Sequence, residues 1–340
     1  MSPTALPWWH PDAIARRRPY LEARARVIAG IRAFFTERGF LEVETPCLQA
    51  APGMEVHLRA FATDLTDALD RVPPRRLYLH TSPEFAMKKL LAGGLPRIFQ
   101  MARVFRNGDI SPTHSPEFTM LEWYRAGATY TDLMDDVAAL FAACGEARPV
   151  ERLSVADAFA RYCDGLDILG TVADPFAAEP PPEALKAAAA RLGVHVGEGD
   201  GWEDAFFHIF LARIESRLGM DGPVILYDWP ACMAALSRRK PDDPRVCERF
   251  EVYVNGLELA NAFGELTDPV EQRRRFTDSM AAKARLYGPE AAWPVEEDFL
   301  AALEYGLPDP CAGIALGVDR LVMVLTGAER IDDVLWAPVG

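Results

Sequence analysis

The spacing of apolar and polar residues near the start of the chain predicts a helix followed by a strand. Five apolar residues recur at the spacing of one helix face: Val27, Ile28, Ile31, Phe34 and Phe35. This pattern predicts a helix over residues 20–38, which Gly39 caps. The segment FLEVETP then predicts a strand, and Pro46 ends it because proline cannot donate a ladder hydrogen bond.

The remaining pattern predicts a sheet flanked by helices. A helix over 84–92 follows the Ser82-Pro83 start signal, and strands are predicted at 97–106 and 117–124. Asn255-Gly256 joins RFEVYV to LELANAF, which is the strongest short signal of a hairpin. AGIALGVDRLVMVLTG predicts a strand, a glycine turn and a helix. We therefore expect an α+β fold with an antiparallel sheet.

Residues 145–200 differ from the rest in composition. They are rich in Ala, Pro and Glu, and PFAAEPPPEALKAAAARLG is a Pro-rich entry into an amphipathic helix. We interpret this stretch as a peripheral helical insertion. The chain is thus expected to comprise an N-terminal tail, residues 1–19, and one catalytic domain, residues 20–340, which carries the insertion.

Composition narrows the classes of function. Half of the residues are hydrophobic, but no run of about 18 apolar residues occurs, and the N-terminus lacks the apolar core of a secretory signal. We expect a cytoplasmic protein without a membrane partner. The net charge of −14 gives no support for extensive tRNA or DNA contact, without ruling it out. The six cysteines include no CxxC pair, so reduced thiols are expected instead of a zinc site or disulfides.

Polar side chains on the predicted strands suggest a ligand site. Strand alternation puts four residues on one face: Phe118, Met120, Glu122 and Tyr124. Arg103 and Arg106 end the strand before them. The alternative is a half-buried core strand with chance polar residues.

The hairpin brings two carboxylates together. A two-residue turn pairs Val254 with Leu257 and Tyr253 with Glu258, which leaves Glu251 diagonal to Glu258 at roughly 7–8 Å between Cα atoms. Such oxygen ligands suit Mg²⁺, which combines one or two carboxylates with substrate phosphates. The alternative is a pair of exposed glutamates on an open sheet.

The last motif completes a site for a nucleoside triphosphate. Gly313 and Gly317 allow close approach of a ligand to the backbone, and Arg320 lies in the first turn of a helix whose N-terminus favours phosphate. Phe118 could cover a base. The remaining polar groups would hold a cationic second substrate: Glu84, Glu122, Tyr124, Asn261 and Glu265.

These segments resemble the class II aminoacyl-tRNA synthetases of the lysine, aspartate and asparagine branch. GFLEVETPCL resembles motif 1, FRNGDISPTHSPEFTMLEWY motif 2, and GIALGVDRLVMVLTG motif 3. TSPE and ERFEVYVNGLELANAFGEL also match the lysine type. Within this branch, TMLEWYR and GIALGVDR are most similar to the elongation factor P lysyltransferase family. Because the motif 1 helix starts near residue 20, no anticodon-binding domain is expected upstream.

The resemblance implies ATP and Mg²⁺ as cofactors and assigns roles by position. Arg106 and Arg320 would be catalytic and grip the phosphates, Phe118 would stack on adenine, and Glu251 and Glu258 would bind Mg²⁺. Further ATP-binding residues would be Asn107, Gly108, His114, Ser115, Leu259 and Gly317. Substrate-binding residues would be Ser82, Pro83, Glu84, Glu122, Tyr124, Asn261, Glu265 and Ala315.

The implied reaction has two steps. The carboxylate of lysine or (R)-β-lysine attacks the α-phosphorus of ATP, and the acyl group of the adenylate then passes to a lysine side chain of elongation factor P. A homodimer is implied through residues 20–48, with Pro46 and the apolar helix face buried between subunits. The preference for β-lysine would rest on Ala315, where the synthetases have Gly.

Two positions depart from the family pattern. Gly108 stands where the family has a Glu that reads the adenine amine, and Ser115 stands where it has Asn. Asp109 or backbone groups would have to replace that glutamate. Three rival hypotheses remain: a truncated lysyl-tRNA synthetase that charges tRNA, a catalytically silent regulatory paralogue, and an amidating ligase of the asparagine synthetase type.

Overall fold

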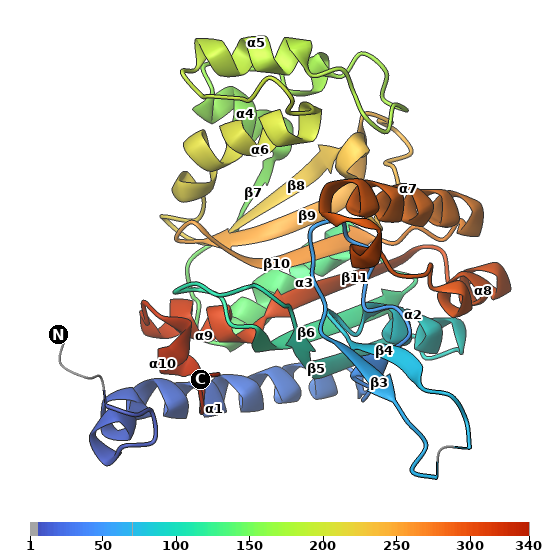
Figure 1. The fold of residues 1–340 in the computed structure, drawn as a ribbon. Helices are drawn as coiled ribbons and strands as arrows, with labels where there is room; N and C mark the ends of the chain where they lie inside the picture. The colour runs from blue at the N-terminus through green and yellow to red at the C-terminus, as the bar shows by residue number, and fades with distance from the viewer. Residues whose placement is uncertain (1–5, 70, 340) are drawn as a thin grey trace.

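The computed structural model describes residues 6–69 and 71–339 (Figure 1). Its strands are β1 (Leu41–Glu42), β2 (Leu48–Gln49), β3 (Ala62–Leu65), β4 (Arg75–Leu79), β5 (Arg97–Phe105), β6 (Glu117–Ala126), β7 (Glu151–Ser154), β8 (Val224–Pro230), β9 (Val246–Val254), β10 (Leu257–Gly264) and β11 (Cys311–Gly317). Its α-helices are α1 (Pro11–Glu37), α2 (Glu84–Ala92), α3 (Tyr130–Ala143), α4 (Val155–Tyr162), α5 (Glu183–Arg191), α6 (Trp202–Arg213), α7 (Pro269–Tyr287), α8 (Glu297–Tyr305), α9 (Val318–Thr326) and α10 (Ile331–Val334). Among these residues no helix is both long and apolar enough to cross a membrane.

Within the described ranges, eight strands form one sheet in the order β1-β5-β6-β11-β10-β9-β8-β7. Neighbours run antiparallel except at the two edges, where β1 is parallel to β5 and β7 is parallel to β8. A small second sheet has the order β2-β4-β3. The predicted α+β fold with a helix-flanked antiparallel sheet is confirmed, as is the hairpin turn, whose Asn255 and Gly256 both have positive φ.

The first helix begins earlier than predicted. Residues 11–19, expected to belong to a tail, form the first turns of α1, and residues 1–5 lie outside the described part. His10 caps the helix by accepting a hydrogen bond from the Asp12 amide, and Pro11 occupies the first turn, where a missing N–H costs nothing. Pro19 lies inside the helix without ending it. Nearby, Arg17 ties the helix to the C-terminal segment by donating to the Asp332 and Leu335 carbonyls.

The strand predicted for FLEVETP is shorter than expected. Only Leu41–Glu42 pairs regularly with β5, and Val43 adds one more hydrogen bond to the Phe99 carbonyl. Beyond it the chain is extended but unpaired with the large sheet, since Pro46 cannot donate. Residues Leu41, Pro46 and Leu48 are exposed as a result.

The insertion is not purely helical and does not end near residue 200. It opens with β7, which adds a strand to the sheet, and it continues through α6 and the 3-10 turn η2 (Glu215–Arg217) before the chain returns in β8. Its helices pack on β8 around aromatic side chains, among them Phe206 and Trp229. The short polar segment ERLS gave no strand signal, because its hydrogen bonds depend on β8, which follows far along the chain.

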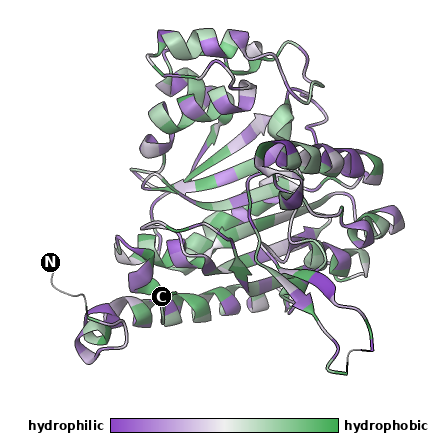
Figure 2. Ribbon diagram, in the orientation of Figure 1, coloured by the Kyte–Doolittle hydropathy of each residue, from purple (hydrophilic) through white to green (hydrophobic). Residues whose placement is uncertain are grey.

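The sheet has one fully covered face and one partly open face. Helices α1, α3 and α9 cover the first, and alternate strand residues such as Leu121, Phe250 and Ile314 form the main core there. On the second face, α2, α7 and α8 cover one end, and the insertion covers the other. Figure 2 shows hydrophilic residues on the central strands between these two covered ends and a largely hydrophilic α7. This region holds the site described next.

Candidate active site

One row of side chains crosses five strands on the partly open face. Backbone register aligns five residues from β5 to β9: Gln100, Glu122, Ala315, Asn261 and Glu251. Neighbours of Glu122 on its strand confirm the predicted alternation, because Phe118 and Met120 pack on this face whereas Leu121 and Trp123 enter the opposite core. The row places a carboxylate at each side of Ala315.

A bulge in β10 brings Asn261 into this row. The predicted pairs Val254–Leu257 and Tyr253–Glu258 are present, and the register then shifts between Glu258 and Ala260. Asn261 consequently pairs with Glu251, and the extra residue, Leu259, turns its side chain into the main core. Leu259, predicted to bind ATP, can therefore reach a nucleotide only through its backbone.

Glu251 and Glu258 share this face, as predicted. Glu251 accepts hydrogen bonds from Arg249 Nη2 at 2.7 Å and from the Tyr253 hydroxyl at 2.5 Å. Burial, and then the charge of Glu251, raise the pKa of Glu258 to about 7, while Arg320 and Arg106 counteract the rise. No cluster of three or more His, Cys, Asp or Glu side chains with metal-binding geometry occurs in the described ranges. The pair fits Mg²⁺, which needs few protein carboxylates when phosphates supply other oxygens.

Cationic groups gather beside this pair. Arg320 Nη1 donates to the Glu258 carbonyl at 2.7 Å, and its Nη2 lies 2.5 Å from His114 Nε2, which ties the motif 2 loop to β10. Arg106 lies with its guanidinium carbon 5.3 Å from the centre of the Phe118 ring. Its Nε is buried and has no hydrogen-bond partner among the described residues. Arg103, in contrast, is exposed beside Glu117 at 3.9 Å, so of the two candidate arginines only Arg106 faces the site.

The rest of the motif 2 loop lies at the edge of the site. Asn107 and Gly108 are exposed, Gly108 has a φ of 95°, and Ser115 is buried. Burial and the charge of Arg320 lower the pKa of His114, which keeps its ring neutral and able to accept a hydrogen bond. A Cβ at Gly317 would make ordinary van der Waals contact with the Leu259 carbonyl oxygen and with Arg320 Cβ and Cδ, each 3.9 Å away.

On the other side of Ala315 lies a largely buried cluster of side chains, Glu84, Glu122, Tyr124 and Glu265, which we call the acidic pocket. Glu122 accepts hydrogen bonds from the Ser82 hydroxyl and from the Tyr124 hydroxyl, the latter at 2.8 Å. Burial, and then the charge of Glu84, raise the pKa of Glu122 to about 8. Burial likewise raises the pKa of Glu265 to about 7. Carboxylates crowded and desolvated in this way favour a cationic ligand.

The sequence did not single out Lys88 or Asp319, and Gly313, predicted to allow close approach of a ligand, has a different neighbour. Lys88 Nζ lies 2.5 Å from both Glu84 Oε1 and Glu265 Oε2, and the only available signal was its spacing of four from Glu84 on a helix. Gly313 is required beside Tyr124, because a Cβ there would lie 2.2 Å from Tyr124 Cε1. Asp319 pairs with Arg24 of α1 and accepts from the Thr119 amide, so it fixes α9 against β6 from behind.

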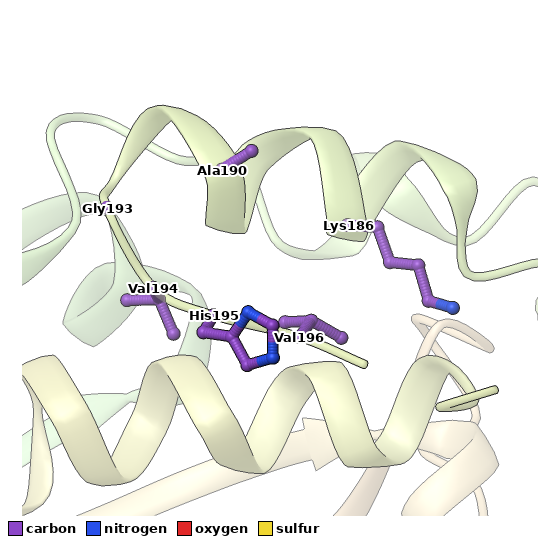
Figure 3. Close-up of a pocket in the computed structure, with 6 residues that line it drawn as sticks. All are labelled: Lys186, Ala190, Gly193, Val194, His195 and Val196. Atoms are coloured by element: carbon purple, nitrogen blue, oxygen red, sulfur yellow. The ribbon is translucent and has the colours of Figure 1, made fainter. Parts of the chain in front are cut away.

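A shallow hollow in the insertion offers no comparable chemistry. Figure 3 shows it between α5 and α6, with His195 and Lys186 as its polar side chains. Its remaining lining is apolar or glycine. No acidic side chain or arginine lines it, so it lacks the groups that gather on the open face of the sheet.

Comparison with known proteins agrees with the geometry. The family model of tRNA synthetases class II (D, K and N) matches residues 14–339. The chain belongs to this family.

Its relatives within the family carry a narrower name. The chain is 43% identical over 337 residues to the elongation factor P--(R)-beta-lysine ligase of Klebsiella pneumoniae (strain 342), with 98% of each chain covered. It is 43% identical over 333 residues to the ligase of that name from Hamiltonella defensa, with 97% of each covered. The Vibrio vulnificus (strain YJ016) ligase is 41% identical over 336 residues, with 97% of this chain and 98% of the relative covered.

Proposed function

We propose that this protein uses ATP to activate (R)-β-lysine, or α-lysine, as an adenylate and transfers the acyl group to a lysine side chain of elongation factor P. One observation carries the proposal: two sets of side chains lie on either side of Ala315 along one row of the sheet. Glu251, on one side, belongs to the set suited to Mg²⁺ and phosphate, and Glu122, on the other, belongs to the acidic set suited to amines. A substrate that spans the row would present its amines to one set and its carboxylate to the other. The names of the relatives supply the acceptor.

Activation would rest on position and charge. Arg106 and Arg320 would donate to the charge that develops on the α-phosphate, and Phe118, whose ring centre lies 5.3 Å from the Arg106 guanidinium carbon, would offer a flat surface for adenine. Asn107, Gly108, His114 and Ser115 would contact ATP from the loop, and Leu259 and Gly317 through backbone atoms. When bound, Mg²⁺ would neutralise phosphate charge from Glu258 and Glu251.

The acidic pocket would recognise the two amines of the substrate. Glu84, at the first turn of α2 after Ser82 and Pro83, would hold the α- or β-amine. Tyr124 and Glu265 would hold the ε-amine, with Glu122 and Asn261 nearby. A buried ammonium needs such partners, because an unpaired charge is expensive to desolvate.

A homodimer through residues 20–48 is part of the proposal, but the contact differs from the one expected. The apolar face of α1 is not available for a partner, since Val27, Ile31 and Phe35 are buried in the core of the same subunit. The exposed extended segment with Leu41, Pro46 and Leu48 is the remaining candidate surface. Sedimentation of wild type and Leu48→Glu tests this: a stable, active wild-type monomer contradicts the dimer.

Pyrophosphate exchange tests the proposed function. We expect exchange that depends on (R)-β-lysine or α-lysine and is absent with asparagine or aspartate. The second step is measured as acyl transfer to elongation factor P and to lysine tRNA in parallel. Transfer to tRNA alone would support the truncated synthetase, and absence of exchange with every amino acid would support a silent paralogue. A cytoplasmic location follows if the acceptor is a translation factor.

A further inference from the structure

Lys88 is the most deeply buried cation of the acidic pocket, and none of the roles proposed above uses it. Its side chain is 1% exposed, and it reaches Glu84 from one turn away on α2 and Glu265 from the segment after β10. Both Nζ–O distances are 2.5 Å. The ring centre of Phe299 lies 5.9 Å from Nζ on a third side.

The two carboxylates that Lys88 bridges are those expected to hold opposite ends of a diamino acid. Glu84 retains Oε2 for a ligand, and Glu265 Oε1 has no hydrogen-bond partner among the described residues. Lys88 therefore contacts one oxygen of each carboxyl group and leaves the other oxygen without an ion-pair partner among the described residues. In this arrangement Lys88 can orient the two carboxyl groups without occupying the positions at which they would bind the substrate amines.

The charge of the pocket depends on the same lysine. Three carboxyl groups, Glu84, Glu122 and Glu265, lie around one buried ammonium, so binding of a substrate with two ammonium groups would favour ionisation of Glu122 and Glu265, whose pKa values burial raises. Burial alone would lower the pKa of Lys88, but Glu265 and Glu84 raise it above its usual value, so Lys88 stays charged at neutral pH. Lys88 in turn opposes the rise in the pKa of Glu265 and of Glu122.

Other charged and titratable groups lie around this cluster. Tyr124 faces it from β6, Cys311 from β11, Arg238 from the segment before β9, and Glu55 acts on Glu84 from the loop before β3. Arg238 already pairs with Glu248 at 2.6 Å and with Asp309 at 2.9 Å, so it is committed elsewhere. Among the described residues, Lys88 is the only cation in contact with the pocket carboxylates.

We propose that Lys88 is a positioning residue: it holds the carboxyl groups of Glu84 and Glu265 in place and apart in the absence of substrate, ready for the two amines of a diamino acid. The proposal rests on the proposed function, because it assumes a diamine substrate. Lys88 makes no contact with reacting atoms in this scheme. Its removal is expected to raise the pKa of Glu265, which loses a neighbouring positive charge, and the protonated carboxyl group then binds an ammonium group weakly.

The test is the pH profile of kcat/KM for pyrophosphate exchange with the preferred diamino acid, between about pH 6 and pH 9.5. In Lys88→Met the acidic limb should move up by at least about one pH unit, because the carboxylates lose a neighbouring positive charge. At pH 6.5 kcat/KM should fall at least about tenfold through the KM for the amino acid, and it should recover to within a few-fold at high pH. The KM for ATP should stay unchanged.

Lys89→Met is the matched control. Lys89 follows Lys88 on α2 but pairs with Glu296 and Asp298 on the outside, at 3.0 and 2.7 Å. The pH profile of Lys89→Met should therefore have its acidic limb at the wild-type position. Lys88→Arg keeps the positive charge, so the acidic limb of its pH profile should stay at the wild-type position even if the larger guanidinium lowers kcat. This variant tests the role of Lys88 if Lys88→Met does not fold.

The outcomes separate this proposal from the function on which it rests. A wild-type limb in Lys88→Met, or a limb in Lys88→Arg that shifts upward, overturns the role of Lys88. Wild-type protein that shows no diamine-dependent exchange overturns the proposed function instead, whatever the variants do.

Discussion

Asn261 lies directly opposite Glu251 on the neighbouring strand, although a regular strand running from Glu258 would turn Asn261 into the core. The bulge at Leu259 makes the difference, because the extra residue restores Asn261 to the face that Glu258 occupies. The phosphate-side carboxylates and the amine-side pocket meet on one row as a consequence.

Glu258→Gln should abolish adenylate formation while leaving the protein at least as stable as wild type. Burial and the charge of Glu251 raise the pKa of Glu258, so without a bound cation its ionised form disfavours the folded state. Pyrophosphate exchange measures the first effect. Thermal unfolding with and without Mg²⁺-ATP measures the second, and the rise in melting temperature caused by Mg²⁺-ATP should shrink in the variant. Wild-type turnover would remove Glu258 from the metal site.

Arg106→Lys should lower kcat for exchange by about 10²–10³, the usual cost of losing one donor to a transition-state charge. A lysine keeps the charge but lacks the planar fork, so it cannot replace two directed donors. Arg103→Lys is the matched control, since Arg103 comes from the same strand but is exposed beside Glu117. Equal activities of the two variants would assign Arg106 a structural role only.

Gly313→Ala should weaken binding of the amino acid without affecting ATP. The added Cβ would lie 2.2 Å from Tyr124 Cε1 and 2.5 Å from Glu265 Oε1, so both groups must move. A misfit of about one methylene in a binding site is worth roughly 1–3 kcal/mol, so the KM for the amino acid should rise about 10- to 200-fold. A variant with unchanged KM for the amino acid would show that the Tyr124–Glu265 contact does not form the amine site.

The parts of this site that the sequence predicted were those set by local rules. Strand alternation put Phe118, Glu122 and Tyr124 on one face, and the Asn255-Gly256 turn fixed the pairing of Glu258 with Tyr253. The bulge at Leu259 was not predictable, because no turn or proline marks it and it depends on packing of that side chain in the core. The role of Lys88 was not predictable for a similar reason: its partner Glu265 is distant in sequence, so only the fold brings the two side chains together.

Stability should fall as pH rises through the range in which Glu122 ionises. Burial, and then the charge of Glu84, raise the pKa of this carboxyl from its usual 4.5 to about 8, so the folded state binds a proton that the unfolded state releases. Its contribution to stability is complete below about pH 4.5 and is lost as pH rises through about 8.

Glu122→Gln isolates this effect, because the amide stays neutral at every pH. The free energy of unfolding of Glu122→Gln relative to wild type should therefore grow in favour of the variant from pH 5 to pH 9, by roughly 1–3 kcal/mol in total, and the melting temperature should follow it. A difference that stays constant with pH would show that Glu122 is ionised in the empty pocket throughout.

The last prediction concerns the choice between β- and α-lysine, and it rests on Ala315. Its methyl group lies on the site face between Glu122 and Asn261, where the two halves of the row meet. Moving the amine from the α- to the β-carbon shifts it by about one C–C bond, roughly 1.5 Å, so a methyl group at this point favours one position over the other. A misfit of one methylene is worth about 1–3 kcal/mol, or 10- to 200-fold in discrimination.

We expect wild type to prefer (R)-β-lysine, and Ala315→Gly to reduce this preference by raising kcat/KM for α-lysine more than for β-lysine. The measurement is kcat/KM of exchange for both amino acids in both proteins. An unchanged ratio of the two kcat/KM values in the variant would show that other residues discriminate between the amino acids. Equal kcat/KM values for β- and α-lysine in wild type would leave transfer to elongation factor P as the only reaction that distinguishes this protein from a tRNA synthetase.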